Sequence, residues 1–152
     1  MLDYRLDHLF TFVAQLQPPQ VLGAMATGVR VNFAIAGGEV SGPRLKGRLL
    51  AVGADFFNLQ TDGVGTLDVR AAIETHDGAL IDVRYQGVGD LGEDGHARFL
   101  RGELPPTLAL RTAPRMATSH PDYLWANRLQ CIGVGEADFS TLKVRYDVYS
   151  IR

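Results

Sequence analysis

Apolar and polar residues alternate along much of the chain in short runs, and each run ends near Gly, Asp or Pro. Such alternation predicts β-strands that bury one face. Many short strands separated by turn residues predict an all-β sandwich or barrel. The runs cover residues 8–16, 29–36, 45–52, 55–60 and 142–151, with a break expected at Gly37-Gly38. The positions that share one face are Phe10, Phe12, Ala14 and Leu16 in the first run and Val144, Tyr146 and Val148 in the last.

The sharpest local prediction is a β-hairpin between residues 65–75 and 79–87. Its three-residue connection, His76-Asp77-Gly78, would put a glycine at the left-handed position of a bulged turn. Pairing Thr75 with Ala79 gives one wholly apolar face, whereas a register slipped by one residue would not. The apolar pairs are then Ile73–Ile81, Ala71–Val83 and Val69–Tyr85, and the other face carries Asp68, Arg70, Ala72, Glu74, Leu80, Asp82, Arg84 and Gln86.

Helical signals are few. Residues 93–101 predict a short helix with Gly102 at its C-terminal end. Residues 122–128 predict a helical turn that follows Pro121 and has Asp122 near its start. Neither is long enough to form a layer, so we expect an all-β fold with one or two short helices.

Length, charge and cysteine content restrict the class of protein. A chain of 152 residues is long enough for one domain, which we expect to span residues 1–152. Its net charge of −2 and the lack of a Lys/Arg cluster argue against nucleic-acid and membrane partners. The N-terminus lacks the features of a secretory signal, and no run approaches the roughly 18 apolar residues of a membrane helix. Cys131, the only cysteine, cannot form an internal disulfide. We therefore expect a cytoplasmic protein.

Four segments in the same order resemble the bacterial family catalogued as domain of unknown function (DUF) 3237. They are GPRLKGRLLAVGADF (42–56), ETHDGALIDVR (74–84), LRTAPRM (110–116) and YLWANRLQCIGVGE (123–136). The resemblance covers about residues 10–149 and implies a closed antiparallel barrel similar to the calycins, the lipocalin-like barrels. It implies no particular reaction. The chain departs from the family pattern at Phe56, where the family usually has Trp, and at Ala109-Leu110, where it tends to have Tyr-Phe.

Arg44, Lys46 and Asp55 are the first group of candidate site residues. Arg44 and Lys46 are two residues apart, so in a strand both point to one face. A carboxylate ligand suits them, and Asp55 suits a general base, with Lys46 as a second catalytic group. The alternative is a structural ion pair at the rim of a barrel.

Five further residues are candidates for substrate binding. Arg111 could point into the cavity as an anion anchor, or it could be a solvent-facing arginine beside Pro114. Trp125 and its neighbours could form an apolar wall with polar tips, or plug one end of the barrel. Arg84 belongs to the polar face of the hairpin, which most simply faces solvent, although the resemblance favours an inward Arg84. The full set is Arg84, Arg111, Tyr123, Trp125 and Asn127.

Several kinds of chemistry have no signal in the chain. No P-loop, GxSxG or GxGxxG motif is present, and His8, His76, His96 and His120 are far apart without metal-site spacing. We therefore expect no cofactor and no metal. Cys131 lies in an apolar run and is expected to be a buried small side chain rather than a nucleophile.

These observations favour a barrel that binds a small molecule in its cavity. One hypothesis is a cofactor-independent enzyme, of the isomerase, cyclase or lyase type, that acts on a small organic acid or aromatic metabolite by acid–base chemistry. A second is a non-catalytic carrier or sensor. A third is a homo-oligomeric structural module. A homodimer is compatible with each of them.

Overall fold

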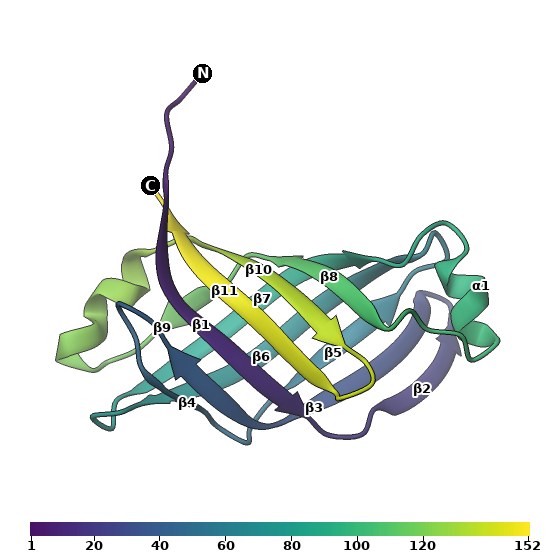
Figure 1. The fold of residues 1–152 in the computed structure, drawn as a ribbon, viewed down its shortest axis with the longest axis horizontal. Coiled ribbons are helices and arrows are strands. Elements are labelled where there is room, and N and C mark those ends of the chain that lie inside the picture. Colours follow the sequence, from purple (N-terminus) through teal and green to yellow (C-terminus); the bar gives the residue numbers. More distant parts are fainter.

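Eight antiparallel strands close into a barrel in the computed structural model, which describes residues 1–152 (Figure 1). The circuit runs β6-β5-β3-β1-β11-β10-β8-β7 and closes where β7 pairs with β6. The expected closed antiparallel barrel is therefore confirmed. The barrel strands are β1 (Leu6–Leu16), β3 (Gly28–Ser41), β5 (Ala54–Leu59), β6 (Val64–Thr75), β7 (Leu80–Asp90), β8 (Thr107–Thr112), β10 (Cys131–Asp138) and β11 (Lys143–Ile151).

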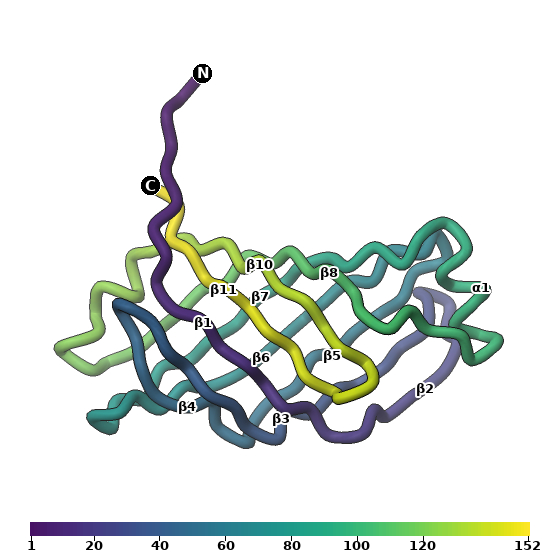
Figure 2. The backbone as a smooth tube through the Cα atoms, viewed as in Figure 1, coloured from purple at the N-terminus to yellow at the C-terminus, as the bar shows by residue number.

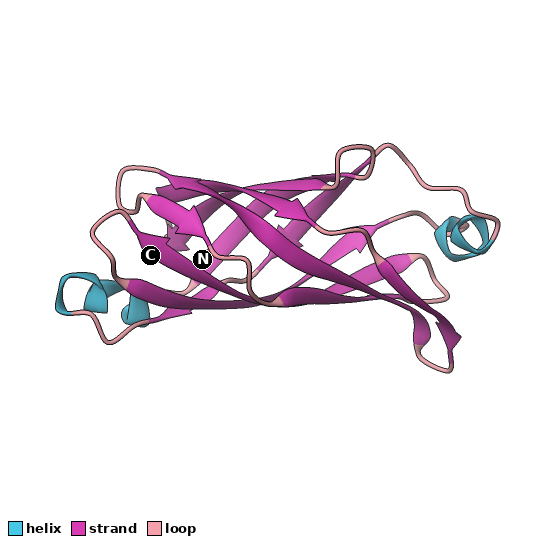
Figure 3. Cartoon of the chain, turned by 90° about the horizontal axis from the view of Figure 1, so that it is seen from below, coloured by secondary structure: helices cyan, strands magenta, loops and turns pink.

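Three short strands and two short helices lie outside this circuit. The strands are β2 (Gln20–Met25), β4 (Gly47–Leu49) and β9 (Arg115–Ala117). The α-helix α1 (Gly95–Leu100) and the 3₁₀-helix η1 (Pro121–Arg128) lie at opposite ends of the barrel, as Figure 3 shows. Neither helix has the length and apolar character needed to span a membrane. Both helices fall where the sequence predicted them, and Gly102 follows α1 with a positive φ of 78°.

The interior of the barrel is filled from the alternating positions of the strands. Phe10, Phe12 and Ala14 of β1 are buried, and so are Tyr146 and Val148 of β11. All of them point to the same side because successive side chains of a strand alternate between faces. The face assignments predicted from the first and last runs are therefore confirmed.

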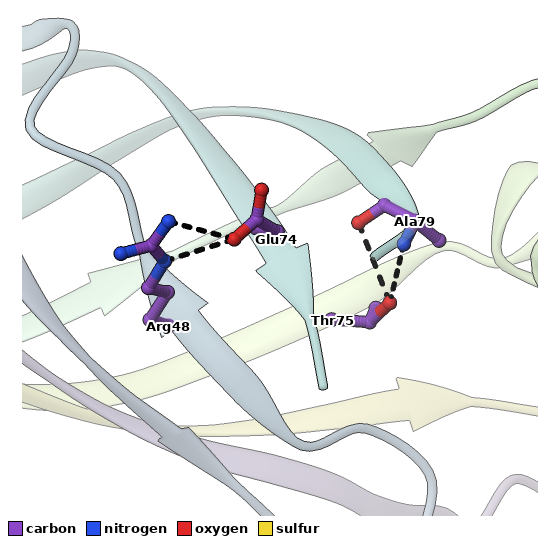
Figure 4. A network of polar contacts seen from close by, with 4 residues as sticks. All are labelled: Arg48, Glu74, Thr75 and Ala79. Atoms are coloured by element: carbon purple, nitrogen blue, oxygen red, sulfur yellow. Dashed lines mark hydrogen bonds and ion pairs between the residues drawn. The ribbon is translucent and has the colours of Figure 1, made fainter. Parts of the chain in front are cut away.

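The predicted hairpin is present in the predicted register. Thr75 and Ala79 flank its turn, and Gly78 has a φ of +88°, which a glycine adopts without strain. The Thr75 hydroxyl accepts a hydrogen bond from the Ala79 amide at 2.8 Å (Figure 4). Beyond the turn, Ile73 pairs with Ile81, Ala71 with Val83, and Val69 with Tyr85.

The expected break at Gly37-Gly38 is wrong. Strand β3 continues through these residues to Ser41 and pairs with β1 along this stretch. A Cβ atom at Gly38 would lie 2.2 Å from the Val13 carbonyl oxygen, so the glycine permits close contact between strands rather than ending one. The prediction also missed β2 and overestimated residues 45–52, of which only Gly47–Leu49 is a strand.

The two ends of the chain meet along one seam of the barrel. Leu6 pairs with Ile151, and Arg5 and Arg152 exchange two backbone hydrogen bonds of 2.8 and 3.0 Å. Figure 2 shows the two termini leaving the barrel side by side. The first and last strands of the sequence thus close the wall.

Candidate functional site

The barrel encloses a cavity of about 70 Å³ with a mostly apolar lining. Aromatic and aliphatic side chains of β1, β3, β6, β7, β8 and β11 form its walls. The volume is well below the roughly 300–1,000 Å³ of pockets that hold drug-sized ligands. The cavity therefore suits a small molecule. Its principal polar groups are the carboxylate of Asp55 and the hydroxyls of Tyr85 and Tyr146.

Asp55 places a carboxylate in this apolar interior. It lies at the start of β5, opposite Phe33 of β3 and Val69 of β6, and its side chain lines the cavity. Burial raises its pKa to about 7. The Asp68 amide, which donates to Asp55 Oδ1 at 3.1 Å, opposes the rise in pKa, and so does the charge of Arg30. Asp55 therefore exchanges a proton near neutral pH.

Tyr85 and Tyr146 pack against each other on the cavity wall. Their ring centroids are 5.6 Å apart with an interplanar angle of 64°. Burial raises the pKa of both phenols, and the negative charge of Asp55 raises it further. Both are therefore hydrogen-bond donors at neutral pH. Tyr146 is 1% exposed, and its hydroxyl interacts with that of Tyr85 but forms no hydrogen bond of good distance and angle. Leaving such a group unpaired costs about 1–3 kcal/mol.

The cavity reaches the turn between β10 and β11. Asp138, Phe139, Leu142 and Lys143 of this turn contribute to its lining. Asp138 and Lys143 are cross-strand partners. Lys143 is the only positively charged residue that lines the cavity. Ser140 and Thr141 donate hydrogen bonds to the carboxylate of Asp138, and these bonds lower its pKa. The same bonds fix the shape of the turn. The charged groups at this end of the cavity belong to its rim.

Arg44 and Lys46 do not accompany Asp55. Both are exposed, they flank the buried Leu45, and neither lines the cavity. The Arg44 guanidinium lies 4.3 Å from the ring centroid of Trp125. A cation above an aromatic face is stabilised by the ring quadrupole. Of the three residues grouped by the sequence, only Asp55 faces the interior.

Arg84 and Arg111 lie on the outer face of the barrel. Arg84 is exposed and directly opposite Arg70, so the inward orientation suggested by the family resemblance is wrong. Arg111 is exposed between the buried Leu110 and Thr112, and it donates to the Leu110 carbonyl at 2.8 Å. Neither arginine lines the cavity.

The residues of η1 make contacts within the protein. The Tyr123 hydroxyl donates to Asp77 Oδ1 at 2.8 Å, which connects η1 to the hairpin turn. The Asn127 side chain forms two hydrogen bonds with the backbone of Thr118, of 2.8 and 2.9 Å. Trp125 is half-buried beneath Arg44. These contacts fix η1 at one end of the barrel, and none of these side chains lines the cavity.

Other reactive groups lie elsewhere. Cys131 is fully buried, and burial raises the pKa of its thiol to about 11, so it is protonated at neutral pH. No cluster of three His, Cys, Asp or Glu side chains has an arrangement that could hold a metal ion. Away from the rim, where Asp138 and Lys143 lie, the chemistry available in the cavity is that of one carboxyl group and two phenols.

Sequence reasoning missed Tyr85 and Tyr146 as site residues. Both were assigned to apolar strand faces, where an aromatic ring is first read as packing. Their hydroxyls are nevertheless polar atoms carried by faces that point inward. A tyrosine on an otherwise aliphatic inner face is the signal that could have identified them.

Comparisons with known proteins agree with this architecture. The sequence profile described as "Protein of unknown function (DUF3237)" matches residues 4–151. The UPF0311 protein RPA1785 of Rhodopseudomonas palustris is 34% identical over 146 residues, which are 95% of this chain and 94% of that protein. Its crystal structure superposes with a TM-score of 0.85, covering 100% of both chains at 30% identity.

Two further solved structures have the same fold. A beta-barrel like protein from Acinetobacter baumannii is 29% identical and has a TM-score of 0.84, covering 100% of this chain and 98% of the other. A protein described as an enzyme from Penicillium herquei is 20% identical and has a TM-score of 0.71, covering 100% of this chain and 97% of the other. At that identity the second likeness concerns the fold alone.

Proposed function

The chain belongs to the DUF3237 family, and we propose that it binds a small, mainly uncharged molecule inside the barrel. The protein would act on this molecule by acid–base chemistry. The observation that carries the proposal is the placement of Asp55, with a pKa of about 7, in an apolar cavity. A general acid or base is most effective when its pKa is near the operating pH. Asp55 would move the proton, and no cofactor is required.

The phenols of Tyr85 and Tyr146 give the proposal a second component. Both hydroxyls would donate to an oxygen of the bound molecule, and this would provide the missing partner of Tyr146. Donors held in place in a site of low polarity stabilise negative charge that develops on an oxygen. An isomerisation, cyclisation or elimination at a carbonyl or phenol would use these groups in that way.

The cavity favours an aromatic or other apolar molecule over a small organic acid. Arg44, Arg84 and Arg111 lie outside the cavity, and its one lining cation, Lys143, is at the rim. An anion inside would face Asp55, and no cation lines the interior to compensate two negative charges, since Arg30 acts on Asp55 from outside the lining. We therefore narrow the expected ligand to a neutral ring or short apolar chain with an oxygen acceptor.

The first experiment is a binding and turnover test with defined probes. Phenol, acetophenone and cyclohexanone would be titrated against the purified protein by thermal shift, and bound compounds would be incubated and analysed for products by mass spectrometry. A ligand at about 100 times its dissociation constant should add roughly 2.7 kcal/mol of stability. Tyr146→Phe should weaken binding of an oxygen-bearing probe, since it removes the unpartnered donor.

Two aspartate variants distinguish an enzyme from a non-catalytic carrier or sensor. Asp55→Asn should abolish turnover and retain probe binding, whereas Asp82→Asn, on the outer face, should change neither. Binding without any product would favour the carrier or sensor hypothesis. Absence of binding by all apolar probes would contradict a ligand site in the barrel.

A further inference from the structure

Three arginines form a row across the outer face of the barrel. Arg70 of β6 is directly opposite Arg84 of β7, and Arg84 is directly opposite Arg115 of β9. All three are exposed, whereas their neighbours Val69, Val83 and Met116 are buried on the inner side. Because adjacent strands are about 4.8 Å apart, the row spans roughly 10 Å at the backbone.

None of these arginines forms an ion pair with a carboxylate. Like charges directly opposite each other destabilise a sheet, so such a row has an energetic cost in the free protein. Arg48 illustrates the usual arrangement elsewhere on the barrel, since it lies 2.7 Å from the carboxylate of its cross-strand partner Glu74 (Figure 4). Among the three arginine side chains, only that of Arg115 forms a hydrogen bond, in which Nη2 donates to the Asn127 carbonyl at 3.5 Å.

The row borders a hollow of about 390 Å³. Its lining includes the three arginines and two further amide side chains, Gln86 and Gln130. Asp68 is its single carboxylate. The hollow is therefore a concave surface with three positive charges, one negative charge and several hydrogen-bond donors.

We propose that this hollow, which we call the arginine hollow, is a binding site for a small anion that carries at least two negative charges. Guanidinium groups bind carboxylates and phosphates in a bidentate manner, and an anion between them would remove the repulsion along the row. Two anionic groups of one ligand, or one phosphate, would match the adjacent guanidinium groups. The guanidinium groups lie on the outer face of the wall, opposite the cavity, and Tyr85 lines both the hollow and the cavity. The proposal does not rest on the function proposed for Asp55.

The test is isothermal titration calorimetry at constant ionic strength. Inorganic phosphate and succinate would be titrated separately into the full chain, with sodium chloride as the reference salt. We expect saturable binding of at least one probe. Arg84→Gln, at the centre of the row, should weaken it about tenfold or more because a charged donor is lost. Arg84→Lys should restore part of the affinity, since it keeps the charge and loses the bidentate fork.

Arg111→Gln is the matched control, since it removes the same charge from the outer face outside the hollow. It should change the dissociation constant less than twofold. Binding of phosphate alone, or of succinate alone, would support the site and identify the anionic group. No saturable binding of either probe, or equal losses in the Arg84 and Arg111 variants, would overturn the proposal.

Discussion

At the scale of single residues, burial of Asp55 makes the stability of the fold depend on pH. Its pKa is about 7 in the folded protein and 3.8 when unperturbed. Between these values the folded state retains a proton that the unfolded state has released. The free energy of unfolding therefore falls as pH rises from about 4 to about 7, and then stays level with respect to this group.

Asp55→Asn should remove this pH dependence. At pH 8 we expect the variant to be more stable than the wild type, with an upper limit of about 4 kcal/mol, because a buried charge has been replaced by a neutral amide. At pH 4 the two proteins should differ little, since the carboxyl group is then protonated in the folded protein. Urea unfolding of both proteins from pH 4 to 8 measures the difference. A constant difference across this range would show that Asp55 titrates normally.

At the scale of elements, the alternation of inward and outward positions along each strand was the reliable guide to which face is buried. It predicted the inner faces of β1, β7 and β11 and the register of the hairpin, because a slip of one residue would bury charged side chains. It could not predict that β3 passes through Gly37-Gly38, because this depends on close contact with Val13, far away in sequence. Glycine marks both turns and close strand contacts, and the local sequence does not distinguish them.

The same limit applied to the candidate site. Asp55 was identified as an acidic residue within a strand, but Arg44 and Lys46 precede β4 and face outward on either side of the buried Leu45. Tyr85 and Tyr146 meet only because β7 and β11 lie across the interior from each other. The sequence therefore indicated one of the three polar groups, and closure of the barrel assembled the rest.

Two glycine variants test this distinction between close contact and turn geometry. Gly38→Ala should destabilise the protein by about 2–3 kcal/mol, since its Cβ would meet the backbone of β1 at 2.2 Å. Gly78→Ala should cost about 1 kcal/mol, because its site is open and only the left-handed backbone is unfavourable. Denaturant unfolding of both variants gives the comparison. Equal losses of stability would contradict the steric role of Gly38.

At the scale of the whole molecule, the seam between β1 and β11 brings together the two ends of the sequence. Leu6 pairs with Ile151, so the barrel closes only when the chain's ends have met. Contacts so distant in sequence carry a loop-closure cost and slow folding. The termini emerge together beside this seam, and β2 lies outside the closed circuit.

A circular permutant would convert this seam into a local contact. Arg152 would be joined to Met1 by a short Gly/Ser linker, and the chain would be opened between Ala26 and Thr27, in the exposed turn after β2. The β1–β11 pair then becomes adjacent in sequence, whereas β1 and β3, which also pair, move to opposite ends of the chain. We expect the permutant to fold to a barrel and to refold at about the wild-type rate, because one long-range pair replaces another. Stopped-flow fluorescence of Trp125, the only tryptophan, measures the rate. A clear change of refolding rate in either direction, at unchanged stability, would contradict this expectation and show that the β1–β11 and β1–β3 pairs do not limit folding equally.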